Sequence, residues 1–265
     1  MTPWEVYAIK YADRNARTRA DSFLFDDNHD APHAMDYFMW LLRRGDEVIL
    51  VDTGYDEAEG SARGRPIRLN PVEALAPFGI TPEAITNIIV SHLHYDHAGG
   101  LHLFPNALLH MQAAEMAFAT GPCMCDDILR APFTAGHVCE AVKRLYSGKL
   151  RFYEGDAQIA EGVTVHCIGG HSRGLQAVRV VTQAGQMVLA SDAAHYYENV
   201  FAMKPFPIVV DLQDMQAGFE TLKNLASGPG LIIPGHDPLV RRYFPEVLTP
   251  FIHRLDIGPT GFTLP

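Results

Sequence analysis

The sequence predicts an α/β protein in which strands and helices alternate along a single domain, residues 1–265. Short runs of β-branched and other apolar residues recur along the chain, each bounded by polar or turn-forming residues, which is typical of buried strands. Segments with helix-capping residues and helical apolar spacing lie between them. Because the two kinds of segment alternate, we expect sheets whose two faces are both partly covered by helices. No internal repeat or flexible linker divides the chain.

The strands are predicted where four to seven apolar residues, rich in valine and isoleucine, stand together. Runs of this length are too short for most helices, and their β-branched content favours extended backbone. The segments are 47–51, 87–90, 107–111, 162–168, 177–182, 186–190 and 231–234.

Helices are predicted from caps and from apolar faces. Asn70-Pro71 and Thr81-Pro82 each join an N-capping residue to a proline at the first helical position. A further helix is indicated by Val138, Val142 and Leu145, which share one helical face. The clearest helix begins near Gln213 and stops at Gly228-Pro229, and its apolar face consists of Met215, Phe219 and Leu222.

Amino-acid composition and net charge exclude several classes of binding partner. The chain is 48% hydrophobic and 20% charged, as in ordinary globular enzymes, and its formal net charge of -10 argues against nucleic acid or anionic lipid as a partner. The N-terminus lacks a basic and apolar leader, and no run approaches the roughly 18 apolar residues of a membrane span. We therefore expect a cytoplasmic protein with no membrane partner. Its four cysteines lack C-x-x-C spacing and are expected to be reduced and mostly buried.

Metal-binding residue types follow the predicted strands. Five strands end within a few positions of a histidine or aspartate: Asp52, His92, His171, Asp192 and His236. Functional residues of α/β proteins often lie in loops at strand ends, because the rigid sheet positions these loops while their side chains are not needed for core packing. Histidine is also abundant, with 13 in 265 residues. The pattern predicts a metal site assembled from strand ends.

The segment SHLHYDHAGG, residues 91–100, holds the densest group of such residues. His92, His94, Asp96 and His97 share no face on a helix or on a strand, so we expect a loop that directs ligands towards two neighbouring ions. Gly99-Gly100 is expected to give that loop its backbone freedom. Three neutral imidazoles complete a zinc site with one open position, and a carboxylate with two oxygens can bridge to a second ion.

These motifs resemble the metallo-β-lactamase superfamily, whose signature loop is H-x-H-x-D-H. SHLHYDHAGG, GGHSRG, SDAA and PGHDP match its successive motifs in order, and VDTG at 51–54 matches its early Asp motif. The resemblance implies an αββα sandwich with metals at one edge. It also implies two divalent ions, with Zn²⁺ as the first expectation, and a supporting role for Asp52. The implied ligands are His92, His94 and His171 for the first ion, Asp96, His97 and His236 for the second, and Asp192 as the bridge.

Within the superfamily, the chain resembles the N-acyl-homoserine lactonases, which are quorum-quenching enzymes. The resemblance implies a small-molecule lactone or ester substrate, opened by attack of a hydroxide that bridges the metals. Asp96, a ligand with a spare oxygen, is a candidate proton shuttle to the leaving group. Those lactonases place a tyrosine three residues after the bridging aspartate, whereas this chain has His195 there and Tyr196 next. His195 and Tyr196 are therefore the candidates for contact with substrate. A homodimer is left open.

Three other readings stay open. Glyoxalase II shares the ligand set but calls for a glutathione-gripping C-terminal region, and only 27 residues follow Pro238. A persulfide dioxygenase would use one iron on a similar loop. A metal-binding protein without catalysis is the third.

The remaining histidines are expected to be structural or on the surface: His29, His33, His102, His110, His137, His166 and His253. A place for His33 at the pocket border is the less favoured alternative. The segment 198–212 reads as a loop in which Phe201, Met203 and Phe206 either line a pocket for an acyl or aromatic group or pack onto the core.

Overall fold

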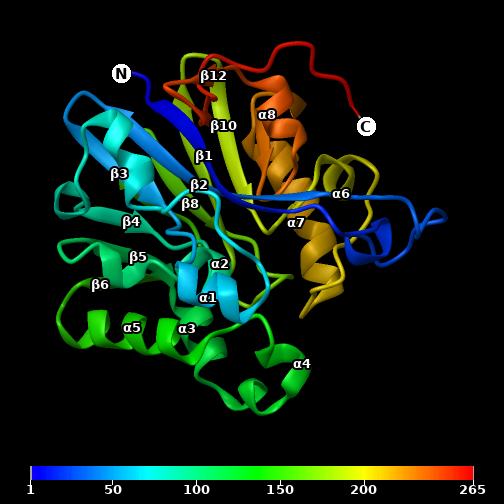
Figure 1. Ribbon diagram of the computed structural model, residues 1–265, viewed down its shortest axis with the longest axis horizontal. Coiled ribbons are helices and arrows are strands. Elements are labelled where there is room, and N and C mark those ends of the chain that lie inside the picture. The colour runs from blue at the N-terminus through cyan, green and yellow to red at the C-terminus, as the bar shows by residue number, and fades with distance from the viewer. Residues whose placement is uncertain (1, 265) are drawn as a thin grey trace.

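A computed structural model describes residues 2–264 as two β-sheets packed face to face, with helices on both outer sides (Figure 1). The first sheet has eight strands in the order β12 (Glu246–Val247), β13 (Thr249–Arg254), β1 (Glu5–Arg14), β2 (Met35–Arg44), β3 (Glu47–Val51), β4 (Asn87–Ile89), β5 (Leu108–Gln112) and β6 (Leu150–Tyr153). The second has five, in the order β11 (Ile232–Pro234), β10 (Gly185–Ser191), β9 (Gln176–Thr182), β8 (Val163–Cys167) and β7 (Ala157–Ala160).

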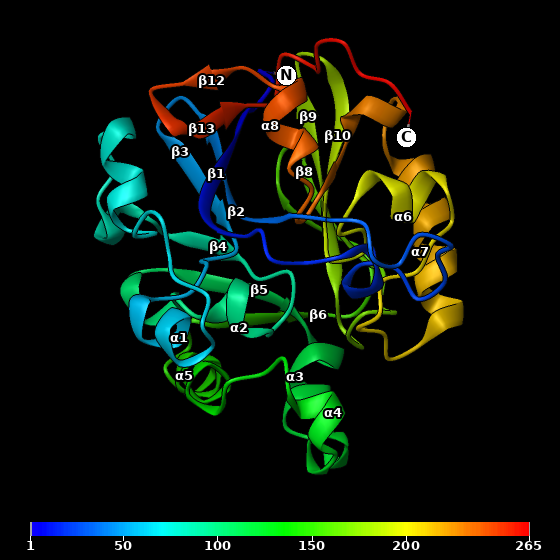
Figure 2. The same cartoon turned by 45° about the vertical axis from the view of Figure 1, so that its right-hand side comes forward.

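The helices lie outside these two sheets. In Figures 1 and 2, α3 and α5 lie on the side of β5 and β6, whereas α6 and α7 lie beyond β8 and β10 on the opposite side. This is the αββα sandwich that the sequence motifs implied. The helices are α1 (Glu57–Ala62), α2 (Tyr95–Ala98), α3 (Ala113–Ala119), α4 (Asp127–Arg130), α5 (Ala135–Tyr146), α6 (Tyr197–Phe201), α7 (Leu212–Leu225) and α8 (Leu239–Tyr243).

The core is divided by the sheets into three layers. Alternate residues of β2 show this division: Phe38, Trp40 and Leu42 face the second sheet, whereas Met39 and Leu41 face the helices on the outer side. In a sheet with one solvent-exposed face, every second residue of a strand is polar. In β2 both faces are buried, so apolar residues occupy both sets of alternate positions. Each layer excludes water on both sides of a sheet, and burial of this apolar surface is the main force that holds the layers together.

All seven predicted strands are present, and no end differs by more than one residue. Six further strands were not predicted from the sequence: β1, β2, β6, β7, β12 and β13. The two longest of these, β1 and β2, pair in the interior of the first sheet, where near-continuous burial removes the polar-apolar alternation that marks a strand.

Among the helices, α7 is confirmed, and its predicted face of Met215, Phe219 and Leu222 is buried. The segments after Asn70 and Thr81 are short 3-10 helices, with the Asn70 side chain accepting from the Val72 N–H at 2.9 Å. Leu145 of α5 is 37% exposed, so only part of that predicted face is in the core. The four cysteines are free, as expected, but all are exposed, so the prediction of buried thiols is wrong. Within residues 2–264, no helix combines the length and apolar character needed to cross a membrane.

Candidate metal centre

The loops that follow β3, β4, β8, β10 and β11 meet at one edge of the sandwich. They bring Asp52, His92, His171, Asp192 and His236 from distant parts of the sequence into one buried cluster. The strands β3 and β4 run parallel in the first sheet, and β10 and β11 run parallel in the second, so each pair delivers its C-terminal loops to the same edge.

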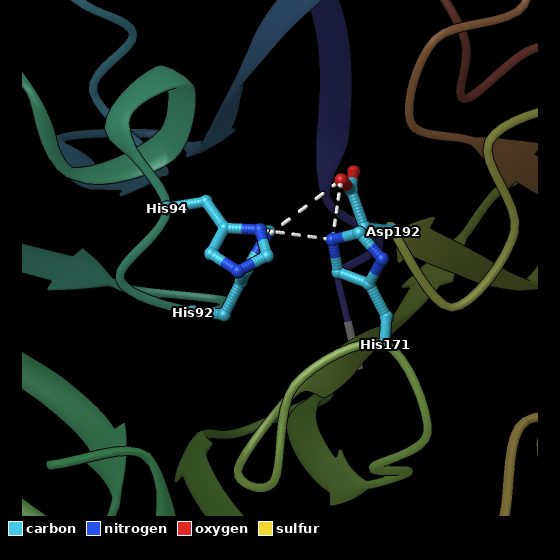
Figure 3. Close-up of side chains that lie close together, drawn as sticks. All are labelled: His92, His94, His171 and Asp192. Atoms are coloured by element: carbon cyan, nitrogen blue, oxygen red, sulfur yellow. Dashed lines mark hydrogen bonds and ion pairs between the residues drawn. The ribbon is translucent and has the colours of Figure 1, made fainter. Parts of the chain in front are cut away.

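The first group of ligand atoms comes from His92, His94, His171 and Asp192. One ligand atom from each lies within 4.8 Å of all the others. His171 Nε2 is 2.9 Å from His94 Nδ1 and 3.1 Å from Asp192 Oδ2, and Asp192 Oδ2 is 3.7 Å from His92 Nε2. Figure 3 shows the three rings and the carboxylate turned towards a common point. Ligand atoms around a tetrahedral zinc ion lie about 3.3 Å apart, given metal–nitrogen distances of about 2.0 Å.

The second group consists of Asp96, His97 and His236, which again lie within 4.8 Å of one another. Asp96 Oδ2 is 3.6 Å from both His97 Nε2 and His236 Nε2. Asp192 reaches this group with its other oxygen, since Oδ1 is 3.2 Å from His97 Nε2 and 3.0 Å from His236 Nε2. The carboxylate of Asp192 thus faces the first group with Oδ2 and the second with Oδ1.

Several polar atoms at the centre of this cluster have no protein partner among residues 2–264. His92 Nε2, His97 Nε2 and Asp192 Oδ1 are buried and make no hydrogen bond. Buried polar groups without partners are costly, so a cluster of them marks a place where a ligand supplies the missing interactions. Converging imidazole nitrogens and carboxylate oxygens are the donors that divalent transition metals accept. The residues therefore fit a pair of divalent metal ions.

The outer nitrogens of the histidine rings are held by the protein. The Nδ1 atoms of His171 and His236 lie 2.7 and 2.8 Å from the carbonyl oxygens of Ile208 and Asp36. His97 Nδ1 lies 2.8 Å from Asp52 Oδ2. A hydrogen bond at the outer nitrogen fixes the tautomer, which leaves the lone pair of Nε2 directed inward. This is the supporting role expected for Asp52.

Asp52 is itself held in a strained conformation, with φ at 60°. Its carboxylate accepts from the Ser91 N–H and from the Ser91 hydroxyl, both at 2.7 Å. These bonds tie the end of β3 to the start of the loop that carries His92. Ser91 also lies 3.0 Å from His92 Nδ1, so the same network orients a ligand of the first group.

The protonation states follow from burial and from neighbouring charges. Burial, with the neighbouring histidines, lowers the pKa of His92 and His94 well below the ordinary value. These two rings are therefore neutral, which is the state that binds metal. Burial also opposes charge on His97, but the carboxylates of Asp192, Asp96 and Asp52 outweigh it and raise the pKa of His97. A cation in the second group would replace that proton between the same carboxylates.

The segment 91–100 is only partly the loop that was predicted. His92 lies outside any regular element, His94 has extended backbone, and α2 then carries Asp96 and His97. Gly99 and Gly100 have ordinary negative φ angles, so the expectation that they give backbone freedom is wrong. They are needed for space, because a Cβ on Gly99 would lie 2.7 Å from Tyr55 Cα and one on Gly100 would lie 2.5 Å from the Thr53 carbonyl oxygen.

His195 and Tyr196 have different surroundings. His195 is buried beside the metal centre, with Nε2 at 3.0 Å from Asp192 Oδ2 and its ring stacked on Phe206 at 3.4 Å between centroids. Tyr196 points away, packing on His33 and directing its hydroxyl to the Ala34 carbonyl at 3.3 Å. The expectation that Tyr196 contacts the substrate is not supported by this placement. His33 lies with Tyr196 and does not line the metal cavity.

Two residues that the sequence analysis missed complete the centre. Glu115, fully buried on α3, accepts from the Leu93 N–H at 2.8 Å, the Ser172 hydroxyl at 2.8 Å and the Gly174 N–H at 3.0 Å. It joins the loop of His92 and His94 to the loop of His171. Tyr37 on β2 lines the cavity, with its ring 5.1 Å from that of His236. Nothing local marks either residue in the sequence, since each lies in an otherwise apolar run.

The metal centre opens into a cavity of about 310 Å³, of the size that holds a small organic ligand. His94, His171, Asp192, His195 and His236 lie at its base. A second, more apolar cavity of about 460 Å³ adjoins it and shares His94 and His171. The walls of the second cavity include Phe118, Ile128, Leu129, Val209 and Val210. Of the three candidates in 198–212, Phe206 lines the first cavity, whereas Phe201 packs on the core and Met203 is exposed.

Other histidines have structural partners. His110 bonds to the Tyr153 hydroxyl at 2.8 Å and to Asn87 Oδ1 at 2.9 Å. His166 lies beside Thr164, as its strand position predicted, with Nε2 at 2.9 Å from the hydroxyl. Both rings therefore use their nitrogens in hydrogen bonds within the fold.

The model of the metallo-beta-lactamase superfamily matches residues 36–236. The N-acyl homoserine lactonase AiiA of Bacillus thuringiensis subsp. kurstaki is 31% identical over 184 residues, which cover 63% of this chain and 67% of the relative. AiiB of Agrobacterium fabrum, with the same activity in its name, is 30% identical over 185 residues, covering 60% and 63%.

Solved structures share the architecture. A Bacillus thuringiensis AiiA variant with N-decanoyl-L-homoserine bound at its active site has a TM-score of 0.74 and 25% identity, covering 90% of this chain and 95% of its own. AidC, a dizinc quorum-quenching lactonase, has a TM-score of 0.71 and 20% identity, covering 99% and 96%, and supports the fold alone. With the family match spanning most of the chain and the clustered histidines and aspartates in the matching motifs, the chain belongs to the metallo-β-lactamase superfamily and is a metal-dependent hydrolase.

Proposed function

We propose that the protein hydrolyses a lactone, a cyclic ester, with a pair of divalent metal ions, of which Zn²⁺ is the first candidate. His92, His94 and His171 would hold one ion, Asp96, His97 and His236 the other, and Asp192 would bridge them. The observation that carries this proposal is the placement of Asp192, whose Oδ2 lies 3.1 Å from His171 Nε2 while its Oδ1 lies 3.0 Å from His236 Nε2. The lactonase names of the relatives support the choice of bond.

When bound, the ions supply an activated water as nucleophile and a Lewis acid that polarises the carbonyl. The protein side chains then have to position the lactone ring and transfer a proton to its leaving oxygen. Asp96 lines the cavity beside His97 and His236, and its second oxygen would be available to pass a proton to the ring oxygen that leaves. His195 Nε2 lies 3.0 Å from Asp192 Oδ2, where it would position the carboxylate that we propose as the bridge.

Tyr37 is the hydroxyl best placed to contact the substrate. Tyr95 donates to the Tyr37 hydroxyl at 3.3 Å, and Arg65 donates to the Tyr95 hydroxyl. The Tyr37 oxygen thus accepts one bond and keeps its own proton for a partner in the cavity. Burial and the nearby Asp96 raise the pKa of Tyr37, so the phenol stays protonated at neutral pH. We assign Tyr37 as the donor that replaces the tyrosine missing at position 195.

The test is a panel of lactones of different ring size and side chain, with proton release followed for protein loaded with Zn²⁺, Mn²⁺, Co²⁺ or Fe²⁺. We expect metal-dependent turnover that His97→Ala abolishes and that His110→Ala, a buried histidine elsewhere, retains. Turnover of S-lactoylglutathione at a rate equal to that of lactones would favour a thioester hydrolase. One iron per chain with oxygen uptake would replace the hydrolytic proposal by a dioxygenase, and absence of metal-dependent turnover on every ester would favour binding alone.

A further inference from the structure

Three arginines line the cavity above the metal centre: Arg14, Arg17 and Arg65. Neighbouring arginines in the sequence pair with carboxylates. Arg19 lies 2.5 Å from Asp26, Arg63 lies 2.5 Å from Glu59, and Arg68 lies 3.1 Å from Asp13. Within residues 2–264, none of the three cavity arginines has a carboxylate oxygen within 4.0 Å. Among these arginines, those that line the cavity have no ion pair within the described part of the chain, whereas their neighbours in the sequence do.

Arg17 is the most telling of the three, because its side chain is only 6% exposed. Its guanidinium donates to neutral groups, to Met35 Sδ at 2.6 Å and to the Asp21 carbonyl at 2.5 Å, and its Nε has no partner among the described residues. A buried cation without a counter-ion is costly. The chain has 31 acidic residues from which a partner could have come. The missing negative charge is therefore expected from a bound molecule.

Arg65 approaches the same region from another element. It donates to the Tyr95 hydroxyl, which in turn donates to Tyr37. Arg65, Arg17 and Tyr37 all line the same cavity. Phe206 links Arg17 to the metal centre, since the guanidinium lies 5.9 Å from this ring and the ring stacks on His195.

The acidic residues of the cavity do not neutralise this charge. Asp96 and Asp192 lie in the ligand groups, where their charge would balance that of bound metal ions. Asp21 is exposed, and its Oδ2 accepts from the Thr18 N–H at 2.9 Å. The adjoining cavity is different, because its walls are mostly apolar and it contains no arginine or lysine. The metal centre therefore lies between a cationic compartment and an apolar one.

We propose that the substrate carries a carboxylate, separate from the ester that is cut, which binds Arg17, Arg65 and Arg14. The identity of the bond rests on the proposed function, but the anion site does not. A planar carboxylate matches the paired N–H groups of arginine, and charge-assisted bonds of this kind are stronger than neutral ones. The ester to be opened then lies at the metals while the carboxylate anchors the other end of the molecule.

Matched pairs of compounds test this proposal. The first pair is 5-oxotetrahydrofuran-2-carboxylate and its carboxamide, and the second is an α-amido-γ-butyrolactone with a terminal carboxylate on its side chain and the corresponding terminal carboxamide. The ratio of kcat/KM within each pair is measured for metal-loaded wild type, Arg65→Gln, Arg14→Gln, Arg17→Lys and the control Arg151→Gln, which removes an exposed arginine of β6. We expect at least one pair to show a ratio of about 10 or more. Arg65→Gln and Arg14→Gln lower this ratio, whereas Arg17→Lys keeps part of it and Arg151→Gln leaves it unchanged.

Binding of the matching lactams, which resist hydrolysis, is measured by calorimetry on the same proteins. Tighter binding of the carboxylate than of the carboxamide, reduced in Arg65→Gln, supports the anion site even if no lactone is opened, in which case only the proposed function fails. Lactone turnover with ratios near 1 in both pairs, together with equal binding of the lactams, overturns the anion site and leaves the proposed function standing. Ratios that the arginine variants do not change also overturn it.

Discussion

The carboxylate of Asp52 lies 2.8 Å from Nδ1 of His97 and turns the opposite nitrogen of that ring towards Asp192 Oδ1, 3.2 Å away. Asp52 contributes no atom to either ligand group, yet it fixes a ligand of the second group and, through Ser91, a ligand of the first. One residue at the end of β3 therefore orients side chains on both sides of the Asp192 carboxylate.

Replacement of Asp52 should weaken metal binding without removing a ligand. In Asp52→Asn, the amide cannot accept from Ser91 with both of its polar atoms, and His97 loses the charge that orients it. We expect metal affinity to fall about 10- to 100-fold, measured by competition with a chelator. Asp46→Asn, which removes an exposed aspartate from the turn before β3, is the control. Unchanged affinity in Asp52→Asn would show that the position of His97 does not depend on this bond.

Glu115 is expected to matter for both loops at once. Its two oxygens accept three hydrogen bonds from residues 93, 172 and 174, so Glu115→Gln places an NH₂ group against at least one donor. A buried donor left without an acceptor costs about 1–3 kcal/mol, which should appear in urea unfolding of the metal-free protein. Glu83→Gln, at an exposed position, should have no such effect. Equal stability of the two variants would mean that the loops are held by other contacts.

His195 should affect the rate more than the metal content. His195→Phe keeps a ring that can stack on Phe206 but removes the bond to Asp192. We expect both metals to be retained and kcat to fall about 10- to 100-fold, as for other residues that orient metal ligands. His195, Asp192 and His236 also form a group that could hold an ion by themselves. Loss of one equivalent of metal in His195→Phe, measured by elemental analysis, would therefore make His195 a ligand.

The clustered histidines and aspartates could be predicted from the sequence because the loops that carry them follow strands with clear apolar runs. NIIV leads into His92 and QMVLA leads into Asp192, and the structure places β4 and β10 there. The αββα fold came with the resemblance of the motifs. By contrast, β1 and β2 escaped prediction because both of their faces are buried, which leaves an apolar run with no period.

The residues that support the site could not be predicted in this way. Tyr37 lies in the run MDYFMWLL and Glu115 in AAEMAFA, and neither is near a ligand in the sequence. Their roles arise only when β2 and α3 pack against the metal loops. Gly99 and Gly100 show the same limit, since the sequence suggests freedom of φ while the fold requires room for Tyr55 and Thr53. The local sequence pattern identifies candidate ligands that follow strands. Contacts between the layers depend on tertiary packing, which the pattern does not contain.

Tyr37 gives a direct test of the donor assignment. Tyr37→Phe removes one hydroxyl and keeps the ring that packs on His236. If this hydroxyl stabilises the charge that develops on the substrate, kcat should fall about 100-fold while metal content and KM change little. Tyr196→Phe is the matched control, because its hydroxyl points to the Ala34 carbonyl outside the cavity. A larger loss in Tyr196→Phe than in Tyr37→Phe would reverse the assignment.

His110 should make the stability of the protein fall in mild acid. Burial, with the charge of Arg151, lowers the pKa of His110 from 6.5 to about 4 in the folded state. Between these values the unfolded chain takes up a proton that the folded protein does not, so the free energy of unfolding decreases as the pH falls through this range. The full effect is about 3 kcal/mol.

The measurement compares urea unfolding of metal-free wild type and His110→Gln at about pH 7.5 and about pH 4.5. Loss of the bonds to Tyr153 and Asn87 lowers the stability of the variant at both pH values, so the informative quantity is the change with pH. Wild type should lose about 2–3 kcal/mol more than His110→Gln over this interval, because only wild type must keep a neutral ring at position 110. His29→Gln, at an exposed histidine, should lose as much as wild type. Parallel pH profiles for wild type and His110→Gln would show that the ring is protonated in the folded protein as readily as in the unfolded chain.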